Sequence, residues 1–139
     1  AVCVKEYYYD SHERNGCQKT DEEYYNDLEK FAEGYSIQKI IIDPSALSFK
    51  TTIKRHGKYI ARDADNSVLD GIRLSATLLQ SGHLYFHESC KNIIEEFGAY
   101  VWDEDSSEDE VIKEYDHAMD AMRYFVQTIM RKIIKFEGV

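Results

Sequence analysis

Hydrophobic and polar residues follow one another along the chain in blocks that predict short strands. Residues 1–9 (AVCVKEYYY) are rich in β-branched and aromatic side chains, which favour strands. Residues 37–42 (IQKIII) end in an unbroken apolar run, which is typical of a strand covered on both faces. Alternation over residues 83–87 (HLYFH) predicts a further strand, and residues 59–61 are a candidate for another short one.

Helices are predicted between these strands from apolar spacing and from residues that start or stop helices. Residues 20–23 (TDEE) form a capping-box pattern that begins a helix extending to about Glu33, and Gly34 is a usual stop. Further helices are expected over residues 45–55, from 66 or 67 to 79, over 89–101 and over 116–131. The last carries apolar residues at helical spacing: Ala118, Ala121, Met122, Phe125 and Ile129. The alternation of strands and helices favours a layered α/β domain.

Length and composition are those of an ordinary globular domain. The chain has 139 residues, of which 43% are hydrophobic and 31% charged, enough for one compact core. No apolar run approaches the roughly 18–20 residues of a membrane helix, and the first residues lack a signal-peptide pattern. Cys3, Cys17 and Cys90 are scattered and odd in number, which suits reduced thiols in an intracellular protein better than a disulfide framework.

The charge distribution is uneven, and this changes what the total implies. A net charge of −9 argues mildly against nucleic-acid binding. Much of the acid lies in residues 103–110 (DEDSSEDE), however, whereas residues 50–62 (KTTIKRHGKYIAR) are basic, and a local basic strip can follow a phosphate backbone. The alternative is a solvated helix face. Candidate phosphate contacts are Lys50, Lys54, Arg55, Lys58 and Arg62.

Asp43 follows directly on the apolar run of residues 37–42. The carboxyl ends of strands in open α/β sheets are usual places for ligand groups, so Asp43 is a candidate metal ligand. It also precedes Pro44 and the predicted helix over residues 45–55, so an N-cap is an equally good interpretation. The pattern alone leaves both open.

Residues 116–124 (DHAMDAMRY) are the second candidate for chemistry. His117 and Asp120 are three positions apart and therefore lie on one helix face. Carboxylates from a strand end and from a helix can converge on a divalent ion, and oxygen ligands suit Mg²⁺ or Mn²⁺. Structural alternatives stay open, with Asp116 as an N-cap, His117 as a solvated group, and Asp120 satisfied by Arg123 or by a backbone donor.

Four segments in this order resemble one known family: IIIDPSA, ADNSVLDGIR, NIIEEFGAYVWDE and DHAMDAMRYF. They are similar to the C-terminal nuclease domain of the large terminase subunit of tailed phages, over nearly the whole chain, and DHAMDAMRY is the most specific segment. The resemblance implies a ribonuclease H-like fold, with a mixed sheet flanked by helices. It also implies a two-metal endonuclease that cuts concatemeric viral DNA during genome packaging, using Mg²⁺ or Mn²⁺.

The resemblance assigns roles to single residues of this chain. Asp43 and Asp120 would be metal-binding carboxylates, and His117 would be a neighbour that assists their site. Glu96 receives no metal role and is expected to be a structural partner, while Tyr100 and Trp102 are assigned to packing.

The resemblance also implies what surrounds the chain. The family has a further catalytic aspartate on a strand upstream of the one that begins here. We therefore expect residues 1–139 to be a single nuclease domain without its first strand or strands and without the packaging ATPase, and with low activity alone. Exposed strand edges would favour pairing with another copy. Expected partners are double-stranded viral DNA, the small terminase subunit and the portal protein, in the cytoplasm of a bacterial host and without a membrane.

Two rival functions remain. One is another ribonuclease H-like nuclease, of the resolvase or integrase type. The other is a non-catalytic interaction module of the packaging machine, held through the acidic residues 103–110 or through the tail of residues 132–139 (KIIKFEGV).

Overall fold

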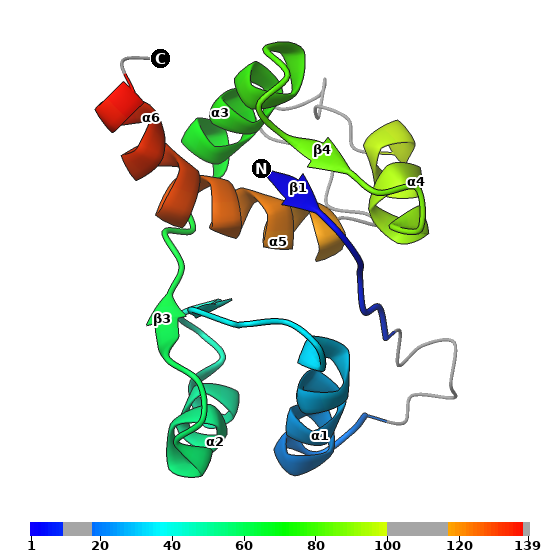
Figure 1. The fold of residues 1–139 in the computed structure, drawn as a ribbon, viewed down its shortest axis with the longest axis vertical. Coiled ribbons are helices and arrows are strands. Elements are labelled where there is room, and N and C mark those ends of the chain that lie inside the picture. Colours follow the sequence, from blue (N-terminus) through cyan, green and yellow to red (C-terminus); the bar gives the residue numbers. More distant parts are fainter. Residues whose placement is uncertain (10–17, 100–116, 138–139) are drawn as a thin grey trace, which may run out of the picture. The chain divides into compact units, whose positions relative to one another are not determined.

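The computed structural model describes residues 1–9, 18–99 and 117–137 (Figure 1). The chain divides into two compact units. Unit 1 comprises Ala1–Tyr8 and Asp65–Val139, and unit 2 comprises Tyr9–Ala64. Five of the features expected from the sequence fall outside the described residues: Cys17, Tyr100, Trp102, the acidic residues 103–110 and Asp116.

Unit 2 is built from two helices and one pair of strands. Its elements are α1 (Asp21–Ala32), β2 (Ile40–Ile42), α2 (Leu47–His56) and β3 (Ala61–Asp63). β2 and β3 pair in parallel, with Ile40 opposite Ala61 and Ile42 opposite Asp63. The buried centre of the unit consists of Tyr25, Ile42 and Ile53, so both helices pack their apolar faces onto the strand pair.

The predicted start and stop of α1 are confirmed. Thr20 Oγ1 accepts a hydrogen bond from the Glu23 amide at 3.2 Å, and the Glu23 carboxylate accepts one from the Thr20 amide at 3.4 Å. This reciprocal pairing satisfies two amides that a helix start leaves without intrahelical partners. Gly34 has a φ of +85°, the left-handed conformation expected where the chain leaves the helix.

Unit 1 contains most of the helices. Its elements are β1 (Val2–Cys3), α3 (Val68–Gln80), β4 (Tyr85–Phe86), α4 (Lys91–Ala99), α5 (His117–Phe125), the π-helix η1 (Val126–Met130) and α6 (Arg131–Glu137). β1 and β4 pair in parallel, with Val2 opposite Tyr85. The described strands therefore form two parallel pairs, one in each unit.

The last helical segment is longer than predicted and changes its winding. α5, η1 and α6 run on as one rod from His117 to Glu137 (Figure 1), whereas the sequence predicted an end near residue 131. The predicted inward stripe is partly wrong, because Ala121 is exposed and Met119, Val126 and Met130 are the buried apolar residues. The π turn inserts a wider step into the 3.6-residue repeat, which a regular helical pattern does not anticipate.

Unit 1 has two buried apolar clusters. One joins Leu78 and Leu84 to Val126 and Met130, and the other joins Cys90 and Ile93 to Met119. The α5–η1–α6 rod thus supplies core residues to both clusters, and its residue Asp120 is placed by this packing. Within the described segments, no helix is long and apolar enough to span a membrane.

Candidate functional site

Asp43 lies one residue beyond β2, in a tight turn. Its Oδ1 accepts hydrogen bonds from the amide and the hydroxyl of Ser45, both at 2.9 Å, and its carbonyl accepts the Ala46 amide at 2.9 Å. The N-cap interpretation of Asp43 is wrong, because α2 begins at Leu47 and its N-cap is Ala46, which makes no side-chain capping bond. The carboxylate instead closes a local turn, the usual behaviour of an aspartate before Pro-Ser.

Asp120 lies in the first turn of α5 and is held by a neighbour on its own helix. Its Oδ1 accepts a hydrogen bond from Arg123 Nη2 at 2.8 Å, and its side chain is 25% exposed. The interpretation that Arg123 satisfies Asp120 is therefore confirmed. Within the described part of the chain, Oδ2 of Asp120 accepts no hydrogen bond.

The start of α5 is fixed by Glu96 of α4. The buried Glu96 carboxylate accepts hydrogen bonds from the Ala118 amide at 2.9 Å and from the Met119 amide at 3.1 Å. A negative charge at this end of the helix also interacts favourably with the helix dipole. The prediction that Glu96 is a structural partner is confirmed, although no sequence pattern indicated which helix it would cap.

His117 is exposed at the first position of α5. Its ring meets the ring of Tyr8 edge-on, with centroids 6.4 Å apart. Because residues three apart on a helix share a face, His117 and Asp120 lie one turn apart on the same side of α5, as the sequence predicted.

The candidate metal ligands come from different units. Asp43 belongs to unit 2, while Asp120 and His117 belong to unit 1. Among the described residues, no three His, Cys, Asp or Glu side chains gather into a metal-binding group. The donor type nevertheless fits Mg²⁺ or Mn²⁺, since both carboxylates offer oxygen atoms and each accepts a hydrogen bond from a side chain, Ser45 for Asp43 and Arg123 for Asp120.

Three of the candidate phosphate contacts are paired with carboxylates inside unit 2. Lys50 forms an ion pair with Asp63 at 2.6 Å, Lys58 lies 4.0 Å from Glu29, and Arg55 pairs with Glu22. Exposed pairs such as those of Arg55 and Lys58 contribute little to stability, so a phosphate can replace the carboxylate there at small cost, whereas the Lys50 side chain is only 19% exposed. Lys54 and Arg62 are exposed and form no ion pair with the residues that the structure describes.

A histidine that the sequence analysis did not single out joins α1 to α2. The ring of His56 stacks on Tyr25, with centroids 3.7 Å apart and planes 6° from parallel. Its Nε2 lies 2.9 Å from Oε2 of Glu22, and this hydrogen bond lowers the pKa of the Glu22 carboxyl below its ordinary value. The available signal was its position, directly after the helix predicted over residues 45–55.

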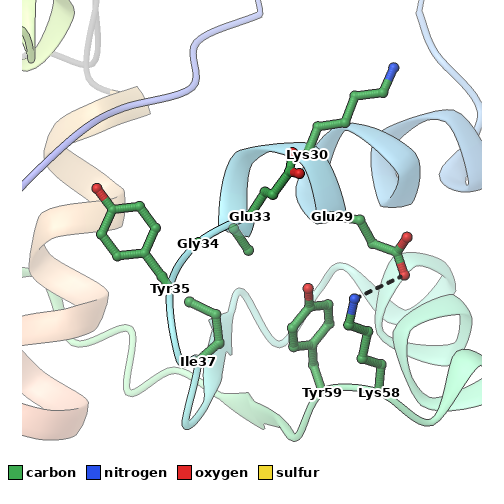
Figure 2. A pocket seen from close by; sticks show the side chains of 9 residues that line it. Glu29, Lys30, Glu33, Gly34, Tyr35, Ile37, Lys58 and Tyr59 are labelled. Atoms are coloured by element: carbon green, nitrogen blue, oxygen red, sulfur yellow. Dashed lines mark ion pairs between the residues drawn. The ribbon is translucent and has the colours of Figure 1, made fainter.

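Unit 2 also contains a shallow cavity of about 590 Å³ near the end of α1. Figure 2 shows its side chains, with the Lys58–Glu29 ion pair beside Tyr59 and with Tyr35 and Ile37 on the loop after α1. None of the candidate metal ligands lines this cavity, and Lys58 is the one candidate phosphate contact that does.

Comparisons with known proteins agree on one family. The family model of the terminase RNaseH-like domain matches residues 7–128. The large terminase subunit of Escherichia phage T5 is 26% identical over 143 residues, which is 94% of this chain and 33% of that protein.

Solved structures give the same result. A large terminase from a thermophilic bacteriophage, in complex with ADP, is 44% identical, with a TM-score of 0.87 over 91% of this chain and 32% of its own. Another structure of that large terminase has a TM-score of 0.88 over 93% of this chain and 33% of its own. The chain thus spans about a third of the length of these relatives.

Proposed function

Because the chain belongs to the terminase RNaseH-like domain family, we propose that it is a metal-dependent DNA endonuclease that cuts concatemeric viral DNA during genome packaging. The observation that supports this most directly is the form of the DHAMDAMRY segment. Its residues 117–124 fold as the start of α5, with a partly exposed Asp120 whose Oδ1 is held by a buried arginine. Carboxylates anchored in this way are typical of metal-ligating positions.

We assign the metal-binding carboxylates to Asp43 and Asp120, with Mg²⁺ or Mn²⁺ as the cation. When bound, a pair of such ions activates a water molecule and stabilises the leaving 3′ oxygen of the cleaved strand. Asp43 contributes from its turn after β2 and Asp120 from the first turn of α5. His117 is exposed on the same face of α5 as Asp120, where it can hydrogen-bond to DNA or accept a proton.

The phosphate backbone would be bound by the basic side chains of unit 2. Lys54 and Arg62 can bind a phosphate without first breaking an ion pair to a described residue. The other three candidates would exchange a carboxylate partner for a phosphate: Lys50, Arg55 and Lys58. This division explains how a chain with a net charge of −9 can bind a polyanion, because the interaction depends on the contacting surface.

Further partners are proposed from the whole relatives rather than from this segment. They are the small terminase subunit and the portal protein, in the bacterial cytoplasm. Self-association through strand edges is a further proposal, since each parallel pair leaves the outer edge of both its strands without a partner in the described residues.

A nicking assay tests the proposal. Supercoiled plasmid is incubated with Mn²⁺ and either this chain or the longest polypeptide that its reading frame encodes. We expect Asp43→Asn and Asp120→Asn each to lower the nicking rate at least about 100-fold, because a neutral amide is a poor ligand for a hard cation. Asp70→Asn, an exposed aspartate of α3, is the matched control and should nick at the wild-type rate.

Two results would count against the proposal. If both asparagine variants nick as fast as wild type, the carboxylates are not the metal ligands. If no protein nicks while all of them bind portal or small-subunit partners equally well, the interaction-module function is the correct one.

A further inference from the structure

The helix that carries Asp120 also carries a buried arginine, which packs against a glycine of α3. We propose that Arg123, packed against Gly71, is a positioning residue that holds the Asp120 carboxylate for the cation. This inference rests on the proposed function, since it takes Asp120 to be a metal ligand. It adds the residues that fix the ligand's orientation.

Arg123 is anchored at both ends of its guanidinium group. Its side chain is only 4% exposed, and Nη2 donates to Oδ1 of Asp120 at 2.8 Å. Nη1 donates to the carbonyls of Asn66 and Ser67, at 2.8 Å and 3.3 Å, in the segment before α3. The planar fork therefore ties α5 to that segment and aligns the carboxylate in the same contact, which the single ammonium group of a lysine cannot reproduce.

Gly71 makes this position of Arg123 sterically accessible. A Cβ atom at Gly71 would lie 2.2 Å from Cγ and 2.6 Å from Cδ of Arg123. These atoms form the middle of a buried side chain, so the whole arginine would have to move. Gly71 lies inside a regular helix, where alanine is otherwise preferred, and the observed contact supplies the reason for glycine.

Arg123 is placed by these contacts and by the ring of Tyr124, whose centroid lies 5.1 Å from its guanidinium carbon. Its Nε and the side-chain amide of the adjacent buried Gln127 have no hydrogen-bond partner among the described residues. The segment before α3 is held a second time by the Asp65 amide, which donates to Thr128 Oγ1 of η1 at 2.9 Å. Arg123 thus contacts a fixed segment on one side and Asp120 on the other.

The consequence for Asp120 is a defined orientation. Because Arg123 engages Oδ1, rotation of the carboxylate is restrained, and Oδ2 is the oxygen left for a cation. Partners that orient a metal ligand typically change metal affinity by about 10–100-fold when they are removed. Loss of the Arg123 fork should therefore weaken cation binding even when the chain stays folded.

Mn²⁺ affinity, measured by titration calorimetry without DNA, tests the inference. We expect Arg123→Lys to raise the Kd at least about 10-fold, at a temperature where circular dichroism shows the variant to be folded. The matched control is Arg131→Lys on the same helical rod, whose exposed side chain lies 4.0 Å from Asp70; its Kd should match the wild-type value. An unchanged Kd for Arg123→Lys overturns the positioning role.

The packing of Arg123 against Gly71 is tested by thermal unfolding of the metal-free chain. Gly71→Ala should lower Tm by about 5 °C or more, because the methyl group displaces Arg123. In an Arg123→Ala background the same substitution should raise Tm, since the obstacle is gone and alanine favours the helix. The exposed Thr77→Ala in α3 controls for helix propensity and should raise Tm slightly in both backgrounds. If Gly71→Ala raises Tm in both backgrounds, or lowers it equally in both, the packing of Arg123 against Gly71 is contradicted.

Asp120→Asn separates this inference from the proposed function. If it leaves Mn²⁺ affinity unchanged, or if the wild-type chain binds no Mn²⁺, then the metal role of Asp120 fails, and with it the positioning role. If it abolishes binding while Arg123→Lys does not weaken it, the proposed function stands and only the positioning role fails.

Discussion

The two candidate carboxylates are held by contacts of different range. Asp43 in unit 2 is fixed by Ser45, two residues away, in a turn that its own short segment can form. Asp120 in unit 1 is fixed by Arg123, which in turn contacts Asn66, 57 residues away in the chain. The Ser45 bonds to Asp43 can form within one short segment, whereas Arg123 reaches its place beside Asp120 only after α3 and α5 have packed together.

This difference matters for the cost of losing each arrangement. A net contribution of about 0.5–1.5 kcal/mol is usual for one hydrogen bond, as in the Asp43 turn. Removing one partner of a largely buried hydrogen bond costs more, about 1–3 kcal/mol, because the remaining group is left without compensation. Unit 1 should therefore be sensitive at its carboxylate-holding residues, while unit 2 should tolerate changes at the corresponding turn.

The largest expected effect on stability is at Glu96. Glu96→Ala leaves the amides of Ala118 and Met119 buried without acceptors and should lower the free energy of unfolding by about 2–3 kcal/mol, measured by urea titration. Glu95→Ala, the exposed neighbour on α4, is the control and should change it by less than about 0.5 kcal/mol. Equal effects for the two variants would mean that the long-range contact between α4 and the start of α5 does not contribute to stability.

A smaller effect is expected at the turn of Asp43. Ser45→Ala removes the hydroxyl donor but keeps the Ser45 amide bond to Oδ1, so the free energy of unfolding should fall by no more than about 1 kcal/mol. Urea titration of Ser45→Ala and Glu96→Ala under the same conditions compares the two losses in free energy of unfolding directly. A loss as large as that of Glu96→Ala would mean that the turn is not merely local.

The sequence was informative where a structure depends on neighbouring residues. The capping box at Thr20, the stop at Gly34 and the strand ending before Asp43 were all predicted, because each involves groups a few residues apart. At residues 43–46 the sequence left an N-cap open as one alternative, because a turn and a helix cap share their residue types and differ only in where α2 begins.

The sequence was less informative where distant segments meet. The acid that caps α5 comes from α4, and the π turn after Phe125 shifts the buried stripe, neither of which follows from local patterns. One signal was available: Gly71 interrupts an otherwise regular helical pattern, and a glycine in such a place usually has a packing reason. That reason is the buried Arg123.

The smallest expected effect is a pH dependence within unit 2. The His56 hydrogen bond lowers the pKa of Glu22 from its ordinary value of 4.5, so the folded state binds the proton less tightly than the unfolded chain does. The resulting stabilisation is present above pH 4.5 and is lost as the pH falls through the lowered pKa. Urea midpoints between about pH 3 and pH 7 should therefore decline less on acidification for Glu22→Gln than for wild type. Glu33→Gln, an exposed acid at the end of α1, should follow the wild-type curve. If Glu22→Gln follows that curve as well, the Glu22–His56 pair adds no electrostatic stabilisation, and α1 and α2 are held by apolar packing and by the stacking of His56 on Tyr25.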